Sequence, residues 1–456
     1  MRSPGIPLLL LAALGCGAPP APRPNVLLIT LDTTRRDHLS VYGYERDTTP
    51  GLVRFAAEGA RFDRAYSPAS ITAESHATLF TGLYPIEHGV VKNGLALPER
   101  HVTLAERLRA LGFQTAAIVS SFVLDRRFGW QQGFDHYEDD FAPAEASWKI
   151  DQWYEFTMST GAFDRRANFT TDRALRWLAH DRDPTRPFLL FAHYFDPHDP
   201  YDPPPPFDAS FKPKPGEVPR LADTLRARDW IDDYDGEIAF TDAQLSRLFE
   251  GLAALGLAER TLVVVVADHG EGLMQHEQMT HGANIYEEVV RVPLLVRLPG
   301  VIAAGTVVDA PVEEVDLLPT VLDLIGAPRE GPLSGRSLAP VLRAVGQLDP
   351  ERPVYLHRRP FDRQVFQGIP VDGEQFGVVR AGWKWIEGTR DGTRALYDLA
   401  SDPLETANRA AAEPDRVREL SNLVGDWRGA HPATAEAAPP IAPEDARRLK
   451  ALGYAE

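Results

Sequence analysis

Apolar residues are concentrated in runs that have the length of buried β-strands. The runs are NVLLITL from Asn25, TAAIVSS from Thr115, PFLLFAHY from Pro187, TLVVVVAD from Thr261 and PLLVRL from Pro293. They are continuous rather than alternating, which is typical of strands that are covered on both faces. We therefore predict a core sheet whose strands are buried on both sides.

Helical patterns lie between these runs. Residues 101–112 (HVTLAERLRALG), 170–181 (TTDRALRWLAHD) and 237–256 (EIAFTDAQLSRLFEGLAALG) place apolar positions three or four residues apart. Strands that alternate with helices predict an α/β fold with a mixed, mostly parallel sheet flanked by helices on both faces. Ligands of such sheets bind at the carboxyl ends of the strands. The Pro-dense segment 196–219 is predicted to be a long ordered loop over the sheet.

The pattern changes beyond Val345. Short strand-like pieces, PVYLH, FGVVRA, WKWIEG and ALYDL, precede a helix that we expect to begin near Glu413. These pieces predict a small C-terminal α+β subdomain. We therefore divide the chain into a leader at residues 1–23, a large domain at residues 24–345 and the small subdomain at residues 346–456.

The leader, MRSPGIPLLLLAALGCGAPP, has the order of an export signal: one Arg, a short apolar run and small residues before Cys16. The run is too short to span a bilayer as a permanent helix. ALGC resembles a bacterial lipobox, and cleavage at another position is the alternative to lipidation at Cys16. Either way we expect an exported protein of the bacterial cell envelope, in the periplasm or on the outer membrane. Its only membrane contact would be a lipid anchor at Cys16.

Composition narrows the classes of partner and of chemistry. The net charge is −17, and no run of Lys or Arg could follow a phosphate backbone, so nucleic acid is excluded as a partner. Cys16 is the only cysteine, which excludes an internal disulfide and a cysteine-ligated metal.

Acidic residues and a histidine stand where two of the predicted strands end. Asp32 follows the first strand, and Asp268 with His269 follows the TLVVVVA strand. An Asp at a strand end often only caps a turn. The presence of Asp and His at neighbouring strand ends instead predicts a divalent metal site at this edge of the sheet.

Thr72, in the stretch ITAESHATLFTG, precedes a helix-like segment. Backbone N–H groups and the helix dipole favour an anion at such a position, and a metal would lower the pKa of the hydroxyl and make it a nucleophile. Thr is also a common helix cap. This stretch by itself leaves both interpretations open.

The ordered motifs of the chain resemble the sulfatase family of the alkaline phosphatase superfamily. They are NVLLITLDTTRRDHLSVYGY, SPASITAESHATLFTGLYPIEHGV, FDPHDPYDPP, VVVVADHGEGL, HGANIYEEVVRVPLLV and VDLLPTVLDLIGAP, with ALYDLASDPLETAN near the C-terminus. The resemblance implies an alkaline-phosphatase-like fold, a sulfatase-like catalytic domain over residues 24–345, and hydrolysis of ester bonds.

The nucleophile motif departs from the family pattern. Sulfatases usually carry C-x-P-S-R, or Ser first, and oxidise that first residue to formylglycine. Here Thr72 takes the first place, Glu74 the Pro, Ser75 the Ser and His76 the Arg. The Thr72 β-carbon bears a methyl, so oxidation would give a ketone, and no formylglycine is expected. A threonine nucleophile resembles the phosphodiesterase, phosphonoacetate hydrolase and phosphoglycerol transferase branches, where the alkoxide attacks phosphorus directly.

The expected metal ligands are Asp32, Thr72, Asp268 and His269. Many sulfatases have Asp where this chain has Thr33, and Asn where it has His269, so the site is softer than calcium prefers. Manganese or zinc is therefore favoured over calcium or magnesium. One site is expected; a second metal would use residues such as His276, Glu271 and Asp196, which could equally be supporting partners.

The remaining candidates follow from the resemblance. His76 replaces an anion-binding arginine, Asn93 stands where phosphonate hydrolases have an anion-binding Asn, and His281 stands near a substrate-contacting Lys. His198 matches the loop His that protonates the leaving group. The alternatives are a turn for Asn93 and a surface position for His198 and His281. Arg35 and Asp37 match the first motif, where they brace the loop.

These observations predict a metal-dependent hydrolase of sulfate- or phosphate-type esters, with Thr72 as the nucleophile and a small-molecule or glycan ester as substrate. Phosphodiesters or phosphonate esters are favoured. The first alternative is an arylsulfatase-like sulfuric ester hydrolase without formylglycine. The alternative from another class is a non-catalytic anion- or glycan-binding lipoprotein.

Overall fold

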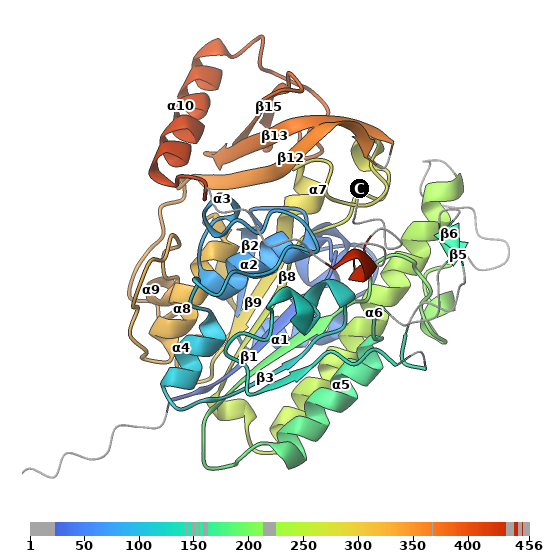
Figure 1. Ribbon diagram of the computed structural model, residues 1–456, viewed down its shortest axis with the longest axis vertical. Coiled ribbons are helices and arrows are strands. Elements are labelled where there is room, and N and C mark those ends of the chain that lie inside the picture. The colour runs from blue at the N-terminus through green and yellow to red at the C-terminus, as the bar shows by residue number, and fades with distance from the viewer. Residues whose placement is uncertain are drawn as a thin grey trace, which may run out of the picture.

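The computed structural model of the protein describes residues 23–142, 144–146, 152–153, 156–157, 163–212, 225–366, 368–434, 442–445 and 449. The expected leader and Cys16 therefore lie outside the described residues. A nine-stranded mixed sheet and a four-stranded antiparallel sheet organise this part of the chain (Figure 1). Within it, no helix combines the length and apolar character that crossing a membrane requires.

The large sheet is most completely buried at its centre. Strands β8, β1 and β7 are buried at every residue, which explains their continuous Val-, Leu- and Ile-rich sequences. The order across the sheet is β10 (Thr306–Val308), β2 (Ala60–Tyr66), β9 (Arg291–Arg297), β8 (Thr261–Ala267), β1 (Asn25–Leu31), β7 (Phe188–Tyr194), β3 (Gln114–Ile118) and β4 (His136–Glu138), with β11 (Val312–Glu313) also paired to β2.

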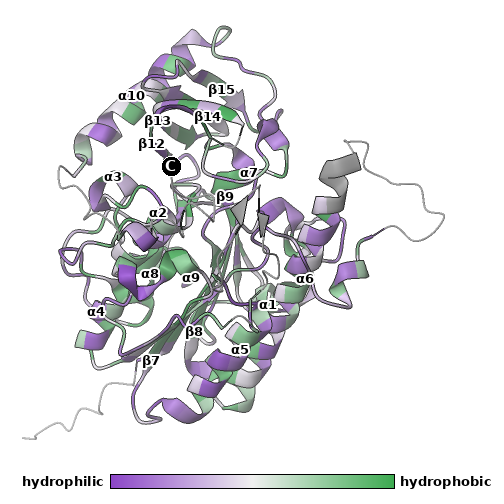
Figure 2. Ribbon diagram, turned by 45° about the vertical axis from the view of Figure 1, so that its right-hand side comes forward, coloured by the Kyte–Doolittle hydropathy of each residue, from purple (hydrophilic) through white to green (hydrophobic). Residues whose placement is uncertain are grey.

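Helices cover both faces of this sheet, and their apolar sides face the strands (Figures 1 and 2). One face carries α1 (Pro50–Ala57), α5 (Ala167–Arg176) and the long α6 (Leu225–Ala254). The other face carries α2 (Thr72–Thr81), α4 (Leu104–Ala110), α8 (Leu317–Leu324) and α9 (Ala339–Leu342). Short helices α3 (Pro85–His88) and α7 (Glu287–Val290) and the ribbon β5–β6 (Gln152–Trp153, Phe156–Thr157) complete this part.

The smaller sheet is formed by β12 (Val354–Phe366), β13 (Ile369–Arg380), β14 (Trp383–Gly388) and β15 (Arg394–Asp398). One face packs on α10 (Pro414–Ala430) through residues such as Phe376 and Trp427. The other face packs on the large domain, where Leu356 and Ile386 meet Ile285. Figure 1 shows this sheet stacked above the carboxyl edge of the large sheet.

The predicted fold class is confirmed. Each of the five apolar runs forms a strand, and the mixed sheet arises because β9 runs antiparallel to both of its neighbours. The helix predicted at 170–181 begins at Ala167 and ends in a π-helical turn, Trp177–Asp181. The Pro-dense loop is described to residue 212, and its remainder lies outside the described residues. The division of the chain at residue 345 stays a prediction.

Candidate active site

The carboxyl ends of three adjacent central strands bring the candidate residues together. Leu31 of β1 pairs with Ala267 of β8 and with Tyr194 of β7. The residues that follow these strands therefore emerge side by side at one edge of the sheet. Asp32, Asp268 and His269 each offer a ligand atom there, and the three atoms lie within 4.8 Å of one another.

Each carboxylate of this group has one oxygen held by the protein and one without a hydrogen-bond partner. Oδ1 of Asp268 accepts hydrogen bonds from the backbone N–H groups of Thr33 and His269, at 3.2 and 2.8 Å. Asp32 Oδ1 and Asp268 Oδ2 are fully buried and have no hydrogen-bond partner within the described residues. Burial raises the pKa of both carboxyls, and Glu271 adds to the effect on Asp32. Two buried carboxylates this close repel each other when ionised, and a cation would offset that repulsion, so the donor set fits a divalent metal. We call Asp32, Asp268 and His269 the metal-binding group.

His269 presents the correct nitrogen for a metal ligand. Its Nδ1 lies 2.9 Å from the carbonyl oxygen of Gly270, which can only accept, so Nδ1 carries the proton. Nε2 then offers its lone pair, 3.5 Å from Asp268 Oδ2 and 3.9 Å from Asp32 Oδ1. Burial also lowers the pKa of His269 well below its usual value, which keeps the ring neutral and able to ligate.

Two further buried histidines hold Asp32 and Thr72 in place through hydrogen bonds. His193 accepts a hydrogen bond from the Ser120 N–H at Nδ1, so its Nε2 carries the proton and donates to Asp32 Oδ2 at 3.2 Å. His76 donates from Nδ1 to the Thr72 carbonyl at 2.8 Å, and its Nε2 lies 2.9 Å from the Thr30 hydroxyl. Both rings are fully buried. His76 thus has its ring nitrogens engaged by protein oxygens, and its geometry favours positioning of Thr72 over direct contact with a substrate anion.

Thr72 is the first residue of α2, and Ile71 takes the N-cap position. Among the hydrogen bonds of the described residues, the Thr72 hydroxyl has one contact, at 3.4 Å from Nε2 of His269. The cap is supplied instead by Asn93, whose Oδ1 accepts a hydrogen bond from the Ala73 N–H at 2.9 Å. The structure therefore separates the two roles that the sequence left open for Thr72: the hydroxyl faces the metal-binding group, and another residue caps the helix.

His198 and His281 lie above the same edge. The ring of His281 is 4.4 Å from that of His269 and 5.3 Å from that of His198, between centroids. Nδ1 of His198 donates to the Asp199 carbonyl at 2.7 Å, and Nδ1 of His281 lies 3.3 Å from Glu271 Oε1. Burial lowers the pKa of both rings to about 3, so both are neutral before an anion binds.

Of the other residues named for a second metal or for support, only Glu271 lies beside the group. His276 stacks on Tyr286 and bonds to Glu288 at 2.8 Å, and Asp196 Oδ2 accepts from the Ala167 N–H at the start of α5. Arg35 forms an ion pair with Asp37 at 2.6 Å and donates to the carbonyls of Glu271 and Gly272. That pair therefore braces the loop after β8.

The contacts that surround α2 could not be predicted from the sequence. Glu74, in the place of the usual Pro, lies 2.7 Å from Nδ1 of His357 on β12, whose Nε2 lies 3.2 Å from Glu374. Ser75 donates to Glu314 at 2.7 Å. Burial alone would lower the pKa of His357, but the hydrogen bonds to Glu374 and Glu74 raise it to about 9. The small sheet thus holds α2 through a charged imidazole.

The sequence marked Thr33 only as a departure from the family pattern, and its backbone conformation was not predicted. Its φ of +49° lies in the left-handed region, which costs a β-branched residue on the order of 1 kcal/mol or more. Its N–H donates to Asp268, and its carbonyl accepts from the Tyr234 hydroxyl at 2.7 Å. These bonds hold the turn after β1 in the conformation that directs Asp32 toward Asp268 and His269.

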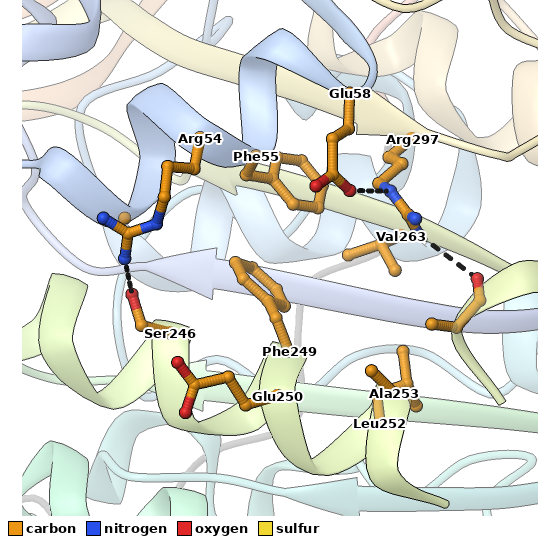
Figure 3. A pocket seen from close by; sticks show the side chains of 12 residues that line it. Arg54, Phe55, Glu58, Ser246, Phe249, Glu250, Leu252, Ala253, Val263 and Arg297 are labelled. Carbon is orange, nitrogen blue, oxygen red and sulfur yellow. Dashed lines mark hydrogen bonds and ion pairs between the residues drawn. The ribbon is translucent and has the colours of Figure 1, made fainter. Parts of the chain in front are cut away.

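The wider hollows on the described surface lie away from this chemistry. Figure 3 shows one of about 240 Å³ between α1 and α6, where the Phe55 and Phe249 rings stack at 4.7 Å and Arg297 pairs with Glu58. None of its lining residues belongs to the metal-binding group. A small pocket of about 20 Å³ opens instead beside α2 and is lined by Asn93 and His281 among others.

Known proteins match over the residues that form this site. The sulfatase family model matches residues 24–327, and the model for the C-terminal region of N-sulphoglucosamine sulphohydrolase matches residues 281–422. Arylsulfatase A of Homo sapiens is 29% identical over an alignment that covers 95% of this chain and 90% of that protein.

Solved structures share the fold. The phosphonate monoester hydrolase of Agrobacterium radiobacter superposes with a TM-score of 0.73 at 23% identity and covers 90% of this chain and 96% of its own. A structure in complex with its substrate, D-glucosamine-2-N,6-O-disulfate, superposes with a TM-score of 0.75 at 22% identity, over 89% and 98% of the two chains. The family match spans both strand ends that carry the metal-binding group, and it shows that this chain is an ester hydrolase of the sulfatase family.

Proposed function

We propose that this protein is a metal-dependent hydrolase in which Thr72 is the direct nucleophile toward a phosphodiester or a phosphonate ester. The observation that carries the proposal is the position of the Thr72 hydroxyl, 3.4 Å from His269 Nε2 and released from helix capping. Formylglycine has no role in this mechanism because Thr72 cannot form it.

Asp32, Asp268, His269 and the Thr72 hydroxyl would hold the metal. A divalent cation bound there would lower the pKa of the hydroxyl and neutralise charge on the substrate. Two carboxylates with one imidazole favour manganese or zinc over calcium or magnesium. His193 and the turn at Thr33 hold the two carboxylates in place through hydrogen bonds to Asp32 and Asp268.

Residues of the chain would transfer the protons and bind the oxygens of the anion. Thr72 Oγ1 attacks phosphorus and forms a covalent phosphoryl-threonine as the bond to the leaving oxygen breaks. His198 takes up a proton at Nε2 and delivers it to that oxygen, so the proton lost from Thr72 departs with the alcohol. A water molecule then attacks phosphorus as the bond from phosphorus to Thr72 Oγ1 breaks. One proton of the water restores the Thr72 hydroxyl, and the phosphate or phosphonate product leaves with the water oxygen. Asn93 Nδ2 and His281 Nε2 are the proposed donors to the anion's oxygens.

The second candidate is hydrolysis of sulfate esters by the same Thr72. It is supported by the relatives, since arylsulfatase A and the disulfate-bound structure share the sequence pattern or the fold. An activated alkoxide could attack sulfur in place of phosphorus. Phosphorus is favoured because direct attack by an unmodified hydroxyl is the chemistry of the phosphodiesterase-like branches.

A substrate panel with a matched trapping experiment tests this proposal. Aryl sulfate, phosphate monoester, phosphodiester and phosphonate monoester would be compared at equal leaving group, and a clear preference for sulfate would reverse our order. Acid-quenched enzyme would be digested and its peptides examined by mass spectrometry for a phosphoryl group on Thr72. A Thr72→Ser variant, which keeps the hydroxyl, should carry the group at the same position, and a label on any other residue would refute the mechanism.

We further propose that the protein is exported and carries a lipid on Cys16. The support is the signal-like order of the leader, ending in ALGC. Metabolic labelling with a fatty acid should mark the wild type and not a Cys16→Ser variant. Secretion of unlabelled wild-type protein would favour cleavage at another position.

A further inference from the structure

A small cationic pocket lies beside the nucleophile helix. It is lined by Ile71, Lys92, Asn93, Arg359 and Phe366, together with His281. Ile71 immediately precedes Thr72, so the pocket opens at the N-terminus of α2. Asp32, Thr72, Asp268 and His269 do not line it. The pocket therefore adjoins the reacting centre, with which it shares Asn93 and His281, but the residues that would hold the metal do not form it.

The polar groups of this pocket are donors. Asn93 is 5% exposed; its Oδ1 is used by the Ala73 N–H, and its Nδ2 has no hydrogen-bond partner within the described residues. A buried amide donor without a partner costs free energy unless a ligand accepts from it. Oδ1 is occupied by the helix, so Nδ2 is the group that Asn93 has left to offer a ligand, and Asn93 lines the pocket.

Arg359 is a positioned charge. It is 4% exposed, and its guanidinium carbon lies 3.8 Å from the centroid of the Phe361 ring and 5.5 Å from that of Phe366. Aromatic faces on this side hold the planar group in one orientation at little entropic cost. The buried guanidinium is thus placed at the pocket before any ligand arrives.

Lys92 adds a second positive charge to the lining of the pocket. It is exposed, and none of the ion pairs found among the described residues includes it. The chain has a net charge of −17, so cations gathered at this pocket contrast with the rest of the protein. Cationic lining of this kind attracts anions and orients them. Ile71 and Phe366 supply apolar walls between the charges.

We infer that this pocket binds a second anionic group, a carboxylate, sulfate or phosphate, on the organic part of the substrate. Arg359 and Lys92 would hold that group, and Asn93 would donate to the linking or reacting oxygens next to it. The inference rests on the proposed function and names its substrate class: an ester that carries another negative charge near the scissile bond. Because Arg359 and Phe366 belong to β12, the small sheet would supply the selectivity.

Matched ester pairs test this inference. In the ester class that the wild type hydrolyses best, a phenyl ester would be compared with its 3-carboxyphenyl and 3-sulfophenyl analogues. We expect kcat/KM to be at least about tenfold higher for a charged analogue, as for a charge-assisted contact. The ratio of kcat/KM for the charged ester to kcat/KM for the phenyl ester should fall to about one in Arg359→Gln. Lys92→Ala should lower this ratio partly, and Arg359→Lys should keep part of it. Comparison of the two analogues separates selectivity for a carboxylate from selectivity for a sulfonate, which stands in for a sulfate.

Arg363→Ala is the matched control, since Arg363 is an exposed arginine on the same strand that does not line the pocket. It should leave the ratio unchanged. An equal loss of kcat/KM for charged and uncharged esters in Arg359→Gln would overturn the inference, because the arginine would then serve the reacting group. Persistence of the ratio in the Lys92→Ala/Arg359→Gln double variant would overturn it too.

A binding measurement keeps the inference testable if no ester is hydrolysed, an outcome that counts against the proposed function alone. Phenylphosphonate and 3-carboxyphenylphosphonate, which have no ester bond to break, would be titrated calorimetrically into the metal-loaded protein. Tighter binding of the carboxylated compound, lost in Arg359→Gln, would support the subsite. Equal affinities would refute it.

Discussion

The Thr72 hydroxyl oxygen lies 3.4 Å from Nε2 of His269, although 197 residues separate the two along the chain. The contact exists because α2 begins at Thr72 directly above the carboxyl end of β8. Nδ1 of His269 is committed to the Gly270 carbonyl, so the nitrogen that faces Thr72 is the one with a lone pair. A metal on that nitrogen would therefore be within reach of the hydroxyl.

Removal of the Thr72 hydroxyl should abolish turnover. We expect Thr72→Ala to lower kcat by roughly 10⁴-fold or more, as for the loss of a covalent nucleophile. Thr72→Ser keeps the hydroxyl and should retain substantial activity. Since the side chain makes no capping bond, neither variant should lower the melting temperature by more than a few degrees. Full activity of Thr72→Ala on its best ester would exclude the mechanism.

Removal of Asp268 should remove the metal. The purified wild type, analysed for metals after dialysis, should contain about one equivalent of manganese, zinc or calcium, and Asp268→Ala should contain little. Asp172→Asn, an exposed carboxylate on α5, is the control and should keep the metal. A metal content unaffected by Asp268→Ala would show that the ion binds elsewhere. Two equivalents in the wild type would indicate a second site.

Chelation should destabilise the protein more at high pH than at low pH. Burial raises the pKa of Glu271 to about 8 when no cation is present, and it also raises the pKa of Asp32 and Asp268. A carboxyl whose folded pKa is raised binds more protons when folded, so the metal-free protein loses stability as pH rises from about 4.5 to about 8. Thermal melts with and without chelator should differ more at pH 8 than at pH 6. A pH-independent difference would contradict this account.

His198 should matter most for poor leaving groups. If it protonates the leaving oxygen, His198→Gln should lower kcat/KM by about 10²–10⁴-fold for an alkyl ester and far less for a nitrophenyl ester. The measurement is the dependence of log kcat/KM on the pKa of the leaving alcohol, which should become steeper in the variant. Parallel losses for both esters would show that His198 binds the anion instead.

The hydrogen bonds of His357 to Glu374 and Glu74 should make stability fall at alkaline pH. The pKa of His357 is raised to about 9, so its stabilisation is complete below the unfolded value of about 6.5 and is lost as pH rises through about 9. The melting temperature of the wild type should therefore decrease between pH 7 and pH 9.5. His357→Gln should melt lower at pH 7, with a cost on the order of 3 kcal/mol for breaking a buried pair, and with a flatter pH dependence. If the melting temperatures of the wild type and of His357→Gln change equally with pH, His357 does not carry the charge assigned to it.

Much of the fold was readable from local patterns. The runs at β1, β7 and β8 are buried on both faces, and burial on both faces leaves a continuous apolar signature. Strand β2 was not predicted, because its sequence ARFDRAY mixes charged with apolar residues, and its burial is uneven. The antiparallel direction of β9 was equally unreadable, since strand direction depends on the connection and not on the residues in the strand.

The sequence by itself determined the chemistry available at the sheet edge: carboxylates and an imidazole at the ends of buried strands, a threonine before a helix, and no cysteine in the large domain. Only the tertiary structure decided how these groups are used. It placed Asn93 on the Ala73 N–H, so that another residue caps the helix that Thr72 begins, and it bonded His76 to the Thr72 carbonyl. It also brought Arg359 and His357 from the small sheet to α2. Local sequence encodes burial and periodicity, but contacts between distant segments arise only when the packed core fixes which elements are neighbours.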